Sequence, residues 1–163
     1  MFLQFGGLGG LILAAASDLR DRIIPNRLVL WVLAAGLGSR IASVGWGSWL
    51  SLVVGIAVFA PLSLLARREV IGGGDAKMIT AATFLAAPRE TPALLLAIAL
   101  AGGALALAAL AAASLRRVWQ RSMRAEGGFA AHSAADWDLA MSSMPFGLAI
   151  LAGSAVVLMR EAH

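Results

Sequence analysis

The stretch that decides the fold is residues 48–88, SWLSLVVGIAVFAPLSLLARREVIGGGDAKMITAATFLAAP. It holds two apolar runs, 48–66 and 76–88, separated by a break with two arginines, three glycines and two acidic residues. A helix that crosses the hydrocarbon core of a bilayer needs about 20 apolar residues. The stretch therefore predicts membrane helices joined by a short polar connection, and it leaves open why charge and glycine gather there.

The whole chain repeats this pattern. Its 163 residues are 60% hydrophobic and 13% charged, whereas soluble domains contain roughly 25% charged residues. Six apolar runs occur, at 2–17, 28–46, 48–66, 76–88, 93–115 and 145–159. Lipid allows only helices or closed barrels, and the runs lack the alternation of barrel strands. We predict an all-α integral membrane protein, a compact bundle of about six transmembrane helices that forms a single domain over residues 1–163.

The runs also differ in length and are rich in small residues. The first, fourth and sixth runs are short for a full span, so we expect neighbouring helices to shield their ends. Alanine and glycine dominate the fifth run, as in LAGGALALAALAAAS at 100–114. Small residues allow membrane helices to approach closely, which predicts a tightly packed bundle.

The basic residues predict the orientation. Ten of the 13 would lie on one side of a six-span chain: Arg20, Arg22, Arg27, Arg67, Arg68, Lys77, Arg116, Arg117, Arg121 and Arg124. The other three are Arg40, Arg89 and Arg160. Cytoplasmic connections carry the excess of Lys and Arg, so both chain ends are predicted outside. We expect Arg40 to extend to the outer membrane interface.

Several functions are disfavoured by composition. The chain has no cysteine and two histidines, which excludes thiol chemistry and disfavours imidazole metal sites, so we expect no metal or other cofactor. The basic residues are scattered at the ends of apolar runs, and we therefore expect no nucleic-acid partner. The first run lacks the basic region of a signal peptide and is interpreted as a retained span.

Two acidic residues adjoin apolar runs, Asp18 after the first and Asp75 before the fourth. Each has a structural interpretation, Asp75 as a helix N-cap and Asp18 as part of a solvated SDLRDR cluster. Two predicted spans separate them, which returns both to the same membrane face. Two close carboxylates cannot readily both ionise, so they share a proton. Such a pair can activate water and protonate a carbonyl, as in an aspartic protease.

Residues around Asp75 extend this hypothesis. Gly72, Gly73 and Gly74 permit positive φ angles and close approach of a substrate backbone, although a flexible turn would need the same residues. Lys77 either orients substrate and tunes Asp75 or serves only as a topology charge. Asp21, one turn after Asp18, is interpreted as a solvated residue.

Three motifs carry a resemblance to a known family. SDLRDRIIPNRL at 17–28, GGGDAKM at 72–78 and MPFGLAI at 144–150 resemble the signatures of type IV prepilin peptidases, in particular the short branch that processes Flp-type pilins of tight-adherence systems. The second motif contains the GxGD pattern of this family.

The resemblance implies an aspartic endopeptidase of the bacterial inner membrane that removes a basic leader from prepilins at the cytoplasmic face. Asp18 and Asp75 match the catalytic aspartates, and Gly72–Gly74, Lys77, Pro25 and Asn26 would shape the site or bind substrate. We expect Pro25 in the first turn of the second helix. The implied partners are the prepilin, membrane lipids and other pilus assembly proteins. Larger members carry paired cysteines associated with N-methylation, so we predict cleavage and no methyltransferase activity.

Two alternatives remain open at the level of sequence. The same aspartates could serve an ion- or proton-coupled transporter, or the chain could be a non-catalytic pilus assembly subunit. Residues 116–144 are predicted to extend the fifth helix into the cytoplasm and then form a loop. In that loop, His132 is interpreted as solvated, and Asp136 and Asp138 as charges able to attract a basic leader.

Overall fold

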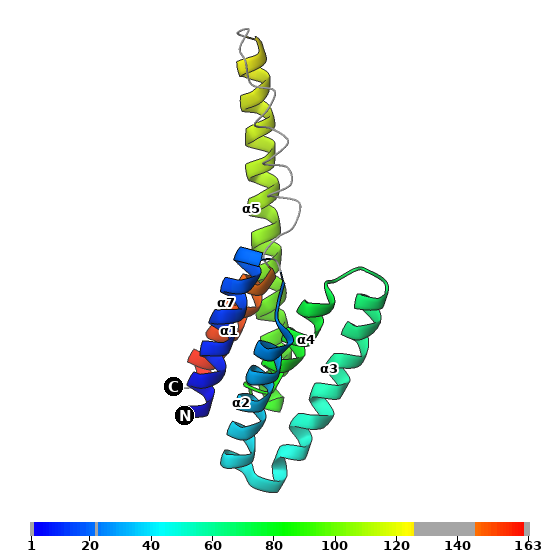
Figure 1. The fold of residues 1–163 in the computed structure, drawn as a ribbon, viewed down its shortest axis with the longest axis vertical. Helices are drawn as coiled ribbons and strands as arrows, with labels where there is room; N and C mark the ends of the chain where they lie inside the picture. The colour runs from blue at the N-terminus through cyan, green and yellow to red at the C-terminus, as the bar shows by residue number, and fades with distance from the viewer. Residues whose placement is uncertain (1, 22, 126–145, 162–163) are drawn as a thin grey trace.

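The computed structural model describes residues 2–21, 23–125 and 146–161, and these ranges form helices and no strand (Figure 1). The α-helices are α1 (Phe2–Asp21), α2 (Asn26–Val44), α3 (Trp49–Arg67), α4 (Gly73–Thr83), α5 (Thr91–Ala125) and α7 (Phe146–Glu161). Two short 3-10 helices, η1 (Gly45–Ser48) and η2 (Pro88–Glu90), precede α3 and α5. The all-α prediction is therefore confirmed for the described residues.

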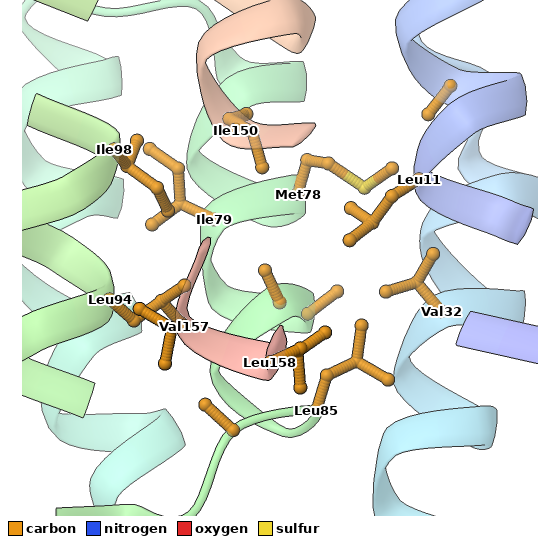
Figure 2. Close-up of a cluster of buried hydrophobic side chains, with 14 of the residues drawn as sticks. Leu11, Val32, Met78, Ile79, Leu85, Leu94, Ile98, Ile150, Val157 and Leu158 are labelled. Carbon is orange, nitrogen blue, oxygen red and sulfur yellow. The ribbon is translucent and has the colours of Figure 1, made fainter. Parts of the chain in front are cut away.

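The core is organised around the short helix α4. This helix packs against α2, α3, α5 and α7, while α7 also packs against α1 and α5. Figure 2 shows Met78 and Ile79 of α4 lying between Leu11 of α1 and Ile98 of α5. All four side chains are buried. The connections that follow α1 and α3 thereby come to the same end of the bundle, opposite the turn between α2 and α3 (Figure 1).

Helix α4 differs from the predicted fourth span. It begins at Gly73 and ends at Thr83, so at about 1.5 Å per residue it is about 16 Å long, roughly half the hydrocarbon thickness. The chain leaves the helix through a turn at Phe84–Ala86 and becomes extended at Ala87. The prediction of a helix over the whole run 76–88 is wrong, while the expected shielding of this short segment by neighbouring helices is confirmed.

Two helices in the described part of the chain are long and apolar enough to cross a membrane. They cover Trp49–Arg67 and Pro88–Arg117, with mean hydropathies of 2.2 and 2.5. Only 17% and 11% of their most apolar windows are buried, so neither resembles the enclosed core helix of a soluble protein. Phe146–Arg160 is also apolar but shorter. The complete bundle of about six spans stays a prediction.

Glycines bring several helices into close contact. A side chain at Gly153 of α7 would place its Cβ 2.6 Å from the backbone nitrogen of Ile98 in α5. At Gly36 of α2, the same atom would lie 2.8 Å from the backbone carbon of Phe84, just after α4. Such distances exclude any side chain without a shift of the backbone, which confirms the predicted close packing through small residues.

Arg40 occupies a different environment from the one predicted. Its side chain is buried, and its Nη2 atom donates a hydrogen bond to the carbonyl oxygen of Leu85 at 2.8 Å. Carbonyl groups at the end of a helix have no partner within the helix, and Arg40 supplies one just after α4. The expected extension of Arg40 to an outer interface is therefore wrong, because this turn is packed inside the bundle.

The predicted extension of the fifth helix is confirmed, since α5 continues through Ala125 and is 35 residues long. The side chain of Trp119 in α5 is exposed. The remainder of the predicted polar segment, residues 126–144 with His132, Asp136 and Asp138, lies outside the described residues.

Candidate active site

Asp18 lies in the last turn of α1 and is buried against the start of α7. Its Oδ2 atom accepts a hydrogen bond from the backbone nitrogen of Gly147 at 2.7 Å. The first N–H groups of a helix have no partner within it, and the positive end of the helix favours a nearby negative charge. The solvated interpretation is therefore wrong for Asp18, whereas Asp21 is exposed as predicted.

Gly147 is a site residue that sequence reasoning missed. A Cβ at this position would lie 2.9 Å from Oδ2 of Asp18 and 3.2 Å from Cα of Ala15. Glycine thus lets the backbone of α7 approach α1 closely enough to donate to the carboxylate. The available signal was the MPFGLAI stretch, which resembled a family motif but gave no partner for its glycine.

Asp75 reaches the site from α4. Gly72 is the N-cap of this helix, and Asp75 is its third residue. The interpretation of Asp75 as the N-cap is therefore wrong. Its carboxylate turns back toward the N-cap, since a Cβ at Gly72 would lie 2.7 Å from Oδ2 of Asp75. Asp75 is partly buried, and its carboxylate accepts no hydrogen bond from the residues that the structure describes.

The three consecutive glycines have different environments. None has a positive φ, because among the described glycines only Gly45 does. The expected use of left-handed backbone is therefore wrong. A Cβ at Gly73 would meet nothing within 4 Å, and one at Gly74 would make ordinary contact with Ile24 at 3.5 Å. Gly72 is thus the position where a side chain would disturb the Asp75 carboxylate.

Lys77 and Asn26 connect α4 to α2. The Nζ atom of Lys77 donates a hydrogen bond to Oδ1 of Asn26 at 3.3 Å. Pro25 is the N-cap of α2 and not a first-turn residue, which corrects its predicted position. Its carbonyl oxygen accepts a hydrogen bond from the backbone nitrogen of Leu28 at 3.0 Å. The bond between Lys77 and Asn26 joins the start of α2 to α4, while the bond to Pro25 closes the first turn of α2.

Seven of the eight predicted site residues line one cavity of about 360 Å³, and Pro25 is the exception. The lining residues are Asp18, Ile23, Ile24, Asn26, Gly72, Gly73, Gly74, Asp75 and Lys77. Ile23 and Ile24 were not predicted, because apolar residues between α1 and α2 carry no chemical signal of their own. The cavity therefore combines two carboxylates, one ammonium group and an open glycine backbone.

The two carboxylates interact electrostatically. Burial and, to a smaller extent, the negative charge of Asp18 together raise the pKa of Asp75 to about 6. Asp75 lies outside both candidate membrane spans. Near neutral pH, Asp75 therefore carries a proton far more often than an ordinary aspartate, which suits it to donate that proton to a substrate carbonyl. The described residues include no group of three His, Cys, Asp or Glu side chains that could hold a metal ion.

Comparison with protein families identifies the class of protein. Residues 5–107 match the model of the type IV leader peptidase family. The chain therefore belongs to this family, whose members are membrane-embedded, and membership implies a peptidase with a prepilin substrate. The matched region includes both aspartates and ends before Gly147. Comparisons with curated proteins and with solved structures each gave no match.

Proposed function

We propose that this chain is an aspartic endopeptidase that removes the basic leader from type IV prepilins, in particular Flp-type prepilins, with Asp18 and Asp75 as its catalytic pair. The observation that carries the proposal is that α1 and α4 contribute these two carboxylates to one cavity. The influence of Asp18 on the Asp75 pKa supports the pairing. Family membership supports the reaction class and the substrate class.

The two carboxylates have distinct roles in this proposal. Asp75 carries the proton and donates it to the oxygen of the scissile carbonyl. Asp18, oriented by the Gly147 N–H group, takes a proton from the water that attacks the carbonyl carbon. The resulting gem-diol collapses when Asp18 gives its proton to the leaving nitrogen and Asp75 recovers one from a hydroxyl group. The C–N bond breaks, and both side chains return to their starting states.

The proposed topology follows the same site. Residues 1–163 would form one domain of about six spans with both ends outside, in the bacterial inner membrane. The connections after α1 and α3 lie at one end of the bundle, as an even number of crossings requires (Figure 1). The excess of basic residues in these connections supports a cytoplasmic site. A prepilin helix could then remain in the bilayer while its leader reaches the aspartates.

The partners and cofactors are proposed on the same basis. The prepilin is the substrate, lipids surround the spans, and other pilus assembly proteins receive the product. The proposed reaction needs water and no metal, cofactor or nucleic acid, and without cysteines we propose no N-methyltransferase activity.

Coexpression with candidate prepilins tests the proposal. Leader removal is followed by gel shift and by N-terminal sequencing of the pilin, and Flp-type and other type IV prepilins are compared. Asp18→Asn and Asp75→Asn should each abolish the cleavage that a gel shift detects while the protein still inserts into the membrane. Asp21→Asn provides a matched control that should remain active, because Asp21 is exposed. Normal processing by either site variant would contradict the catalytic pair.

The two alternative functions give different results in the same system. A transporter would show aspartate-dependent ion flux in proteoliposomes without prepilin cleavage. A non-catalytic assembly subunit would support pilus formation equally well with either aspartate replaced. Family membership favours the peptidase over both.

A further inference from the structure

A second cavity, which the proposed reaction does not use, lies between α2, α3 and α4. Its volume is about 280 Å³. Val29 and Leu33 of α2 line one wall, and Leu52, Ile56 and Phe59 of α3 line the other. We call this cavity the α2–α3 groove. Its walls are apolar.

The α3 wall of the groove is open to the exterior. Ile56 is 69% exposed, and Leu52 and Phe59 are also exposed, whereas Val29 on the opposite wall is buried. The base is formed by α4, where Thr80 donates its hydroxyl hydrogen bond to the carbonyl oxygen of Ala76 at 2.9 Å. An apolar occupant would therefore leave this hydroxyl group satisfied.

The groove adjoins the aspartate cavity at one shared residue. Lys77 of α4 lines both spaces, while Phe84 lines the far end of the groove. Lys77 and Phe84 are seven positions apart, which corresponds to about 10 Å or about two helical turns. One end of a molecule bound in the groove would thus lie next to Asp75.

We infer that the α2–α3 groove binds the first two turns of the apolar helix that follows the scissile bond of the substrate. This inference rests on the proposed prepilin peptidase function. A helix that lies in a groove presents anchors at positions i, i+3, i+4 and i+7, and these span the distance from Lys77 to Phe84. The helix would begin at Lys77, so that the preceding peptide bond enters the aspartate cavity.

Lys77 has a specific role at this junction. An ammonium group has three N–H donors, and one of them in Lys77 is directed to Asn26. The others are available to the carbonyl groups of a substrate chain that passes from the groove to the aspartates. Lipid could cover any apolar outer face, whereas a groove that ends at two carboxylates fits an apolar helix attached to a scissile bond.

Filling the groove tests this inference. Two synthetic prepilin peptides are compared with the purified full chain in nanodiscs: one with a basic leader and an apolar helix, the other ending just after the scissile bond. Ile56→Trp should lower kcat/KM about tenfold for the long peptide, which corresponds to about 1.4 kcal/mol. It should leave the short peptide within about twofold. Val53→Trp is the matched control on α3, because Val53 is exposed and does not line the groove.

The outcomes separate this inference from the proposed function. Equal losses on both peptides, or no loss on the long one, would overturn the groove assignment while leaving the peptidase intact. If the wild-type protein cleaves neither the long nor the short peptide, the proposed function is overturned and the groove assignment with it.

Photocrosslinking identifies the occupant directly. A benzophenone amino acid replaces Ile56 in the Asp75→Asn background, and the same residue at exposed Leu100 of α5 is the control. The long peptide should crosslink through its apolar helix at Ile56 and not at Leu100. Capture of lipid alone at Ile56 would overturn the inference.

Discussion

The two aspartates reach one cavity from regions that are built differently. Asp18 is buried where α1 meets α7, and the Gly147 backbone donates to its carboxylate. Asp75 is the third residue of the short helix α4, and no described residue donates a hydrogen bond to its carboxylate. The α1–α7 contact orients the Asp18 carboxylate through a backbone hydrogen bond. At Asp75, partial burial and the charge of Asp18 instead raise the pKa, which supports the assignment of Asp18 as base and Asp75 as acid.

Gly147→Ala should lower activity more than the other glycine substitutions, because it displaces the Asp18 carboxylate. The Cβ of Gly147→Ala would lie 2.9 Å from Oδ2 of Asp18 and would force α7 away from α1. We expect kcat to fall about 100-fold, within the range for a mispositioned catalytic base, with a much smaller change in KM. Steady-state kinetics with a prepilin peptide measure both constants.

Gly103→Ala is the control for a helical glycine in open space, since a Cβ at Gly103 meets nothing within 4 Å. Wild-type kcat in Gly147→Ala would refute the orienting role of the Gly147 backbone. A KM increase without a kcat change would place Gly147 in substrate binding instead.

The protonation of Asp75 predicts the pH dependence. Its pKa of about 6 means that the proposed acid loses its proton as pH rises through this value. The cleavage rate kcat/KM should therefore fall about tenfold per pH unit well above pH 6. Peptide cleavage measured between about pH 5 and 8 provides the profile. A rate that stays constant across this interval would contradict Asp75 as the proton donor.

Gly72→Ala should lower activity less than Gly147→Ala, and it acts through the Asp75 carboxylate. The new Cβ would lie 2.7 Å from Oδ2 of Asp75, and the carboxylate can move away because it is the end of a side chain. We expect a loss of about tenfold in kcat, toward the lower end of effects on acid–base groups. Gly73→Ala meets nothing within 4 Å and should retain wild-type cleavage. Equal losses in both variants would indicate a general requirement for glycine.

The smallest expected effect is at the end of α3. Glu69 has a φ of 58°. The backbone hydrogen bonds from the Val70 N–H to the Leu65 carbonyl and from the Glu69 N–H to the Ala66 carbonyl form a Schellman motif. Glycine is preferred at the position of Glu69 in this motif. Glu69→Gly should stabilise the folded protein by about 1 kcal/mol. Thermal unfolding in detergent measures the change, and unaltered cleavage is expected. A lower unfolding temperature would contradict strain at Glu69.

The sequence was sufficient for what depends on local pattern. The lengths of the apolar runs and the composition predicted an all-α chain, and counting crossings predicted that Asp18 and Asp75 share one membrane face. The carboxylates do line one cavity. The Gly147 contact could not be predicted because it joins residues that are 129 positions apart.

The errors have the same physical origin. Arg40 was assigned to the membrane interface because its run is apolar, yet the turn after α4 needs a hydrogen-bond donor inside the bundle. The alternative interpretation of Asp75 as a helix cap, which rested on the glycines before it, fails because α4 begins earlier, after Gly72. In both cases, the ends of the short helix α4, which the apolar run 76–88 did not predict, decided the outcome.

The most direct test of the account is a double-mutant cycle on the two aspartates, measured as single-turnover cleavage of a prepilin peptide by purified protein. Asp18→Asn and Asp75→Asn should each lower the rate by about 100- to 10,000-fold. Because residues that act as one unit are not additive, the double variant should be no slower than the slower single variant. Losses that multiply in the double variant, or a single variant that cleaves at the wild-type rate, would contradict a single catalytic pair.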